Sequence, residues 1–119
     1  MPASIQRERE SIYVLRCSGT VGKEEFEAVQ TILAKDIDTG VKPRILALLD
    51  GFEGWERNAG WGDLEFLFSH SSEIAKIAIV GDARWETNAS AFAGAGMRPA
   101  PVKFFPSGQE VQAREWLAE

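Results

Sequence analysis

The chain has 119 residues, a net charge of −5 and a pI near 4.9. Its length fits one domain, and its apolar fraction of 45% is that of a globular protein and not of a disordered chain. The acidic balance excludes a nucleic-acid binding surface, because such surfaces carry stripes of lysine and arginine that neutralise phosphates.

The sequence also indicates where the protein resides. No apolar run approaches the roughly 20 residues that span a bilayer, and the first nine residues contain no apolar signal core. We therefore expect a cytoplasmic protein, while apolar contact with a membrane surface stays open because it does not depend on charge. Cys17 is the only cysteine, which excludes an internal disulfide and a Cys-x-x-Cys metal or redox pair. Its strand-like surroundings favour a buried inert thiol over a reactive one.

Two short strands within residues 4–19 are the first predicted elements, and one amphipathic helix follows them. Between residues 20 and 38, apolar side chains recur at three- and four-residue steps, which predicts a helix with one buried stripe. We expect Thr20 to be its N-cap and Gly40 to end it. The stripe comprises Phe26, Val29, Ile32, Leu33 and Ile37.

Two apolar strands dominate the middle of the chain, over residues 44–50 and 76–82. Both are apolar on both sides, which is typical of a parallel sheet covered on its two faces. A helix over 60–72 is predicted to connect them, with Leu64, Leu67 and Phe68 facing inward. A second crossover helix fits residues 84–93, and the last strand fits 102–105.

The final predicted helix starts at Pro106-Ser107. Ser107 and Glu110 have the spacing of a capping box, and Ala113, Trp116 and Leu117 can face the sheet. The element order is therefore ββαβαβαβα. This order predicts a single α/β domain over 1–119, with a mostly parallel sheet and an antiparallel N-terminal strand.

Taken in their order and spacing, several segments resemble the SpoIIAA-like family from about Ile12 to Leu117. The resemblance implies a STAS-like fold, related in shape to anti-sigma factor antagonists and to lipid-carrying CRAL-TRIO domains. It also implies small-molecule or lipid binding and contact with a membrane. The segments that carry it are the strand ending in Asp50, the aromatic loop after it, Trp61-Gly62-Asp63, Ile77-Ala-Ile-Val-Gly-Asp82 followed by Trp85, Phe104-Phe105 and Ala113-Arg-Glu-Trp116-Leu117.

The chain departs from the anti-sigma factor antagonists at one stretch. Those proteins carry a phosphorylatable serine in an Asp-Ser-Ser/Thr-Gly stretch after the central strand. Here the corresponding residues read Asp50-Gly-Phe-Glu-Gly54, with no hydroxyl group. Regulation by phosphorylation at this point, which would place charge at a helix N-terminus, cannot be carried over.

Ligands of open α/β sheets collect beyond the carboxyl ends of the parallel strands. In this chain that edge holds Asp50, Gly81-Asp82 and Pro106-Ser107, and a loop predicted over 51–62 rises from it. The loop places three large aromatic residues among four glycines. It suits a lid over an apolar ligand or a patch that enters a membrane interface, and the alternative is that its aromatic residues cap the core.

Other chemistry has weaker support in the sequence. Asp50 and Asp82 would form a carboxylate pair for acid–base work, but aspartate at a strand end more often caps the next turn. His70 is the only histidine, so no multi-histidine metal site exists, and its position near a helix end favours a dipole-stabilising role over lining the pocket. No Walker or Gly-x-Gly-x-x-Gly pattern is present, and we expect no cofactor and no metal.

The sequence thus predicts a non-enzymatic module that binds a small apolar or lipid-like ligand and contacts a membrane through the aromatic loop. The alternatives are a STAS-type protein-interaction module without the phosphorylatable serine, and a hydrolase or other enzyme. Trp61 and Phe66 would also serve a homodimer interface. Trp85 and Trp116 follow helical spacing beside apolar neighbours, the pattern of core residues. The predicted ligand-binding residues are Asp50, Phe52, Trp55, Trp61, Leu64, His70, Asp82 and Trp85.

Overall fold

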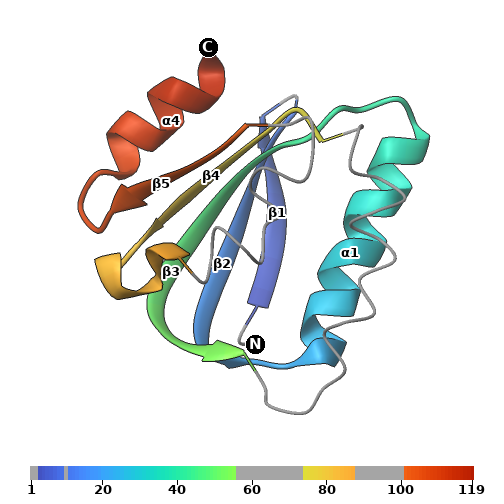
Figure 1. Cartoon of the computed structure of the whole chain (residues 1–119). Coiled ribbons are helices and arrows are strands. Elements are labelled where there is room, and N and C mark those ends of the chain that lie inside the picture. Colours follow the sequence, from blue (N-terminus) through green and yellow to red (C-terminus); the bar gives the residue numbers. More distant parts are fainter. Residues whose placement is uncertain (1–2, 10, 56–73, 88–100) are drawn as a thin grey trace.

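The computed structural model describes residues 3–9, 11–55, 74–87 and 101–119, and the strands of these residues form one five-stranded sheet (Figure 1). Its strand order follows the chain, β1-β2-β3-β4-β5, with β1 antiparallel to β2 and every later pair parallel. The predicted mixed α/β sheet with an antiparallel first strand is confirmed. The elements are β1 (Ala3–Arg9), β2 (Ile12–Val21), α1 (Lys23–Asp38), β3 (Arg44–Trp55), β4 (Lys76–Gly81), the 3-10 helix η1 (Ala83–Trp85), β5 (Val102–Pro106) and α4 (Glu110–Ala118).

Two predicted crossover helices fall wholly or largely outside the described residues. The helix predicted over 60–72 lies outside them entirely. Of the helix predicted over 84–93, only residues 84–87 are described: the 3-10 helix η1 ends at Trp85, and residues 86–87 are α-helical. Among the described residues, no helix combines the length and the apolar character that crossing a bilayer requires.

Helix α1 begins three residues later than predicted. Thr20 belongs to β2, where it pairs with Gly54 of β3, so its predicted role as N-cap is wrong. A β-branched threonine fits the pleated sheet well, and the position before the helix is taken by Gly22 without a side-chain cap. The predicted end at Gly40 is confirmed. Its N–H bonds the carbonyl of Ile37 at 2.9 Å, and its φ of 97° turns the chain so that the N–H of Val41 reaches the carbonyl of Asp36 at 3.4 Å.

The two faces of the sheet bury separate apolar clusters, one under α1 and one under α4 (Figure 1). Val29 and Leu33 of α1 pack onto alternate residues of the strands. Ile32 is wrongly predicted to join them: its side chain is 46% exposed, because it lies about 100° around the helix from Leu33. The cluster under α4 contains Val14, Leu46, Leu48, Ala78, Val80, Phe105, Ala113 and Leu117.

The last helix is fixed at both of its ends by features other than the predicted capping box. Gly108 adopts a φ of 92° in a turn, so α4 starts at Glu110 after Gln109, and Ser107 is not its cap. At the other end, Arg44 donates to the carbonyl of Leu117 at 2.5 Å and Lys76 donates to that of Trp116 at 2.9 Å. Two cations at the carbonyl end of a helix satisfy free acceptors and complement its dipole.

A hydrogen bond links β2 to α1 across the other face. The Tyr13 side chain, 1% exposed, donates its hydroxyl to a carboxylate oxygen of Asp36 at 2.5 Å. Burial, the bond to Asp36 and the charge of Asp36 together raise the pKa of Tyr13 to about 12, against a smaller opposing effect of Arg7. The pair holds the last turn of α1 against the start of β2.

Strand β3 is longer than predicted, and this extension shapes the carboxyl edge of the sheet. Its pairing with β4 ends at Leu48 opposite Val80, but its pairing with β2 continues to Trp55 opposite Val21. The predicted loop over 51–62 is therefore wrong for its first five residues. Gly51 and Gly54, with φ of 68° and 116°, allow the strand to bend while it stays paired (Figure 1).

Candidate functional site

The candidate site lies at the carboxyl edge, where β3 and β4 stop pairing. Asp50 and Asp82 each follow the last β3–β4 pair by two residues, and both side chains are exposed. Asp82 precedes η1 and accepts a hydrogen bond from the backbone N–H of Arg84 at 3.0 Å. The capping role that the sequence favours over acid–base work is confirmed for Asp82.

An aromatic pair closes the core at this edge. The Phe52 side chain is 4% exposed and belongs to the cluster under α1, and the half-buried Trp85 packs against it. The two ring centroids are 4.9 Å apart at an interplanar angle of 66°, the favoured edge-to-face arrangement. Phe52 thus caps the core, as the alternative interpretation of the loop predicts, and it is not part of a lid.

The position of the Trp85 ring depends on a glycine. A Cβ atom built on Gly54 would lie 3.4 Å from the ring of Trp85, and Gly54 has a φ that side chains rarely adopt. The bend of β3 therefore places the backbone of Gly54, which carries no side chain, against the indole ring of Trp85. This contact keeps the ring at the edge, next to the strand extension.

Arg84 is a residue of this edge that the sequence does not single out. Its guanidinium carbon lies 5.1 Å from the centroid of the Trp85 ring, within the range of a cation–π interaction. Sequence reasoning misses it because a single arginine in a turn carries no motif. The only sequence feature that could have pointed to Arg84 is its position two residues after Asp82, the capping aspartate.

The remaining predicted site residues are not brought together by the described part of the chain. Trp55 is the last residue of β3. Trp61, Leu64 and His70 lie outside the described residues, as does Phe66. The described part of the edge therefore consists of Asp50, Phe52, Asp82 and Trp85, with Gly54 and Arg84 added by the structure.

The rest of the described chain shows neither a metal-ligand cluster nor a reactive thiol. Within the described ranges, no three histidine, cysteine, aspartate or glutamate side chains group together as metal ligands would. The Cys17 thiol is buried, and desolvation raises its pKa to about 12, so it stays protonated at neutral pH. The predicted burial of this thiol is confirmed.

Comparison with known proteins supports the fold over nearly the whole chain. A family model described as SpoIIAA-like matches residues 12–118. A crystal structure of an uncharacterised DUF3478-family protein with a SpoIIAA-like fold, from Shewanella loihica PV-4, has 24% sequence identity and a TM-score of 0.69; the alignment covers 97% of this chain and 91% of that one. Among curated proteins, none is significantly similar.

Two further solved structures are of the anti-sigma factor antagonist SpoIIAA. Its unphosphorylated form has 13% identity and a TM-score of 0.63, with 96% of this chain and 97% of that chain covered. The phosphorylated form of the Bacillus cell fate determinant SpoIIAA has 13% identity and a TM-score of 0.60, with 96% and 98% covered. At these identities the likeness establishes a shared STAS-like fold.

Proposed function

The chain belongs to the SpoIIAA-like family, and from this premise we propose that it is a non-enzymatic binding module for a small apolar or lipid-like ligand. The ligand would bind at the carboxyl edge of the sheet, where open α/β folds bind theirs. One observation carries the proposal: Trp85 presents part of an indole ring at this edge, on a support made by Phe52 and Gly54.

The groups around Trp85 suit an amphipathic ligand. The ring offers apolar surface, while Arg84, Asp50 and Asp82 offer charged groups at the same edge. Binding sites for small molecules combine an apolar wall with a few polar groups that fix orientation. A ligand with an apolar body and a polar head would use both.

We include peripheral membrane contact in the proposal, through two aromatic residues: Trp55, the last residue of β3, and Trp61, six positions further along the sequence. Large aromatic side chains are favoured at the boundary between lipid and water. Sedimentation with vesicles of neutral phosphatidylcholine tests this part, since the acidic chain gains nothing from anionic lipid. A double variant Trp55→Ser, Trp61→Ser that sediments as well as the wild type would contradict it.

The principal experiment is native mass spectrometry of the protein purified gently from its own host. We expect an added mass that is lost on denaturation and that identifies the cargo. A Trp85→Ser variant should lose this mass, because it removes the apolar wall. Trp116→Ser is the matched control, since Trp116 is also half-buried but belongs to α4 and packs against the apolar cluster on the other face.

The outcomes of this experiment separate the hypotheses. If the Trp85→Ser variant retained as much bound ligand as the wild type, the ligand would not bind at this edge. If the protein carried no small molecule and instead co-purified with a protein partner in a fixed ratio, a protein-interaction module would be supported. That second function is favoured by the fold shared with the anti-sigma factor antagonist SpoIIAA. It would act without a phosphorylation switch at 50–54, where no residue carries a hydroxyl group.

A further inference from the structure

An arginine stands beside the aromatic ring at the carboxyl edge without a carboxylate partner. Arg84 lies in η1, its side chain is exposed, and its guanidinium carbon is 5.1 Å from the centroid of the Trp85 ring. Within the described residues, no side chain forms an ion pair with this guanidinium. The neighbouring Asp82 is turned to the backbone instead, because its Oδ1 accepts the N–H of Arg84 at 3.0 Å.

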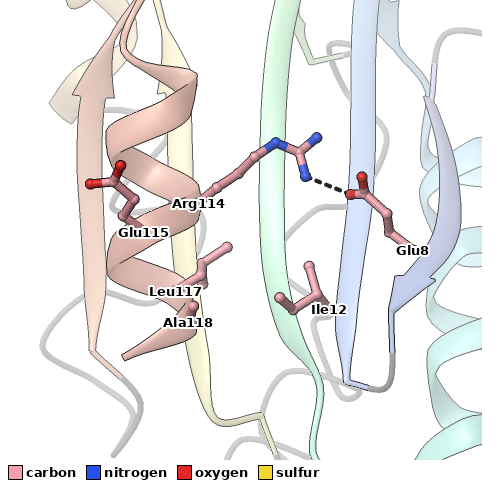
Figure 2. A pocket seen from close by; sticks show the side chains of 6 residues that line it. All are labelled: Glu8, Ile12, Arg114, Glu115, Leu117 and Ala118. Carbon is pink, nitrogen blue, oxygen red and sulfur yellow. Dashed lines mark hydrogen bonds and ion pairs between the residues drawn. The ribbon is translucent and has the colours of Figure 1, made fainter.

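Other arginines of the described chain use their guanidinium groups to hold the fold. Arg114 donates to Glu8 at 2.6 Å and so ties α4 to β1 (Figure 2). Arg44 donates to the carbonyl of Leu117 at 2.5 Å. Both of these side chains are only partly exposed. Arg84 makes no such bond to the described chain, so its N–H groups face solvent or a bound molecule.

The turn η1 fixes the place of this guanidinium relative to the ring. Asp82 accepts the backbone N–H of Arg84 through its side chain at 3.0 Å and that of Trp85 through its carbonyl at 2.9 Å. The Trp85 ring packs against Phe52 and lies next to Gly54. An arginine that contacts a ring through its planar face keeps its fork of N–H groups for an oxyanion. Apolar surface and an N–H fork therefore lie side by side on a supported turn.

We propose that Arg84 binds the head group of the ligand and that this head is a carboxylate, so that the ligand is an amphipathic monocarboxylate of the fatty-acid type. The inference rests on the binding function proposed above and adds the chemistry of its ligand. The apolar tail would lie along Trp85, and the carboxylate would accept two N–H bonds from Arg84. The parallel N–H groups of a guanidinium match the two oxygens of a carboxylate.

The other charges of this edge favour a head with one negative charge over a head with two. Asp50, Asp82 and Glu86 are exposed carboxylates of the same edge, and they repel any anion. A phosphate monoester carries nearly two negative charges at neutral pH, so they repel it more strongly than a carboxylate. A cationic head would be attracted by these carboxylates but would meet Arg84, the cation that contacts the ring.

The probes are three molecules with a straight alkyl tail of similar length: octanoate, octanol and octyltrimethylammonium. Each is titrated into the isotopically labelled protein, and NMR follows the Trp85 indole and the backbone amides next to Arg84. We expect octanoate to bind about tenfold more tightly than octanol, because hydrogen bonds to a charged group contribute that factor. Octyltrimethylammonium should bind no more tightly than octanol. Acetate, which has the head without the tail, should leave the shifts unchanged.

Three variants test whether Arg84 is the group that selects the head. Arg84→Gln should remove the advantage of octanoate over octanol and leave the binding of octanol unchanged. Arg84→Lys keeps the charge but loses the N–H fork, so it should retain only part of the advantage. Lys42→Gln is the matched control, because it removes one positive charge from an exposed side chain at the opposite end of the sheet, before β3.

The results separate this inference from the function on which it rests. Octanol that shifts Trp85 at the same concentrations as octanoate would overturn the carboxylate head and leave the apolar site in place. Octyl phosphate that binds more tightly than octanoate would overturn the choice of a carboxylate. An equal loss of octanoate binding in Lys42→Gln and Arg84→Gln would indicate general attraction between charges and no contact with Arg84. No shift at Trp85 with any of the probes would contradict both the inference and the proposed function.

Discussion

Replacing Tyr13 by phenylalanine should lower the free energy of unfolding by about 1–1.5 kcal/mol. The substitution keeps the buried ring and removes only the hydroxyl that bonds Asp36. A hydrogen bond to a charged acceptor contributes about 1.5–3 kcal/mol when the partner stays buried. Asp36 is half-buried, so water can replace the lost donor and the cost falls below that range. For a domain of this length the midpoint of thermal unfolding should drop by roughly 4–6 °C.

The assay is urea unfolding of the wild type, Tyr13→Phe, Asp36→Ala and the double variant. Because the two groups contact each other, the cycle should give a coupling energy of about 1 kcal/mol. A coupling below about 0.3 kcal/mol would refute the inference that the hydroxyl–carboxylate contact stabilises the fold.

Tyr13 also makes a pH dependence measurable. Its pKa in the folded state, about 12, is raised above the ordinary value of 10.0. The stability that this shift represents is therefore fully present below pH 10 and is lost as the pH rises through 12. Tyr13 is the only tyrosine, so the ultraviolet absorbance of tyrosinate reports on it alone. A folded-state titration near pH 10 would contradict the burial argument.

Two more predictions follow from single side chains. In Gly81→Ala, the added Cβ would lie 2.8 Å from the Cβ of Leu49, and we expect a loss of about 1–3 kcal/mol in urea unfolding; an unchanged midpoint would mean that β3 and β4 separate easily there. The Cys17 thiol should react with an aromatic disulfide at least about 30-fold more slowly in the folded protein than in urea at neutral pH, because burial raises its pKa from 9.0 to about 12 and also shields the sulfur. Equal rates in the two states would show that the thiol is open to solvent.

The strands of the sheet could be predicted from the sequence because their pattern is local. Residues 45–48 and 77–80 are apolar on both sides, and the structure pairs them in parallel at the centre of the sheet. The extension of β3 could not be predicted, because Gly51 and Gly54 favour a loop. Here the same two residues bend a strand that continues to pair with β2.

The candidate sites were predictable only in part, for a related reason. Asp50 and Asp82 could be placed at one edge because strand ends can be located in the sequence. The support of Trp85 by Phe52, and the bond between Glu8 and Arg114, join residues far apart in the chain. The hydrophobic periodicity of the sequence does not predict such pairs, because they form only when the sheet brings its strands and helices together.

The agreement between strand order and chain order has a consequence for synthesis on the ribosome. Each described strand can add to the open edge of the strands before it, and none of these five strands has to insert between two neighbours. Growth of this kind keeps each step close in sequence, which favours early and rapid folding. The face under α4 behaves differently, because Leu46, Ala78 and Phe105 lack their packing against Ala113 and Leu117 until the last helix emerges. A nascent chain stalled before α4 would present an apolar surface, and chaperones would meet that surface first.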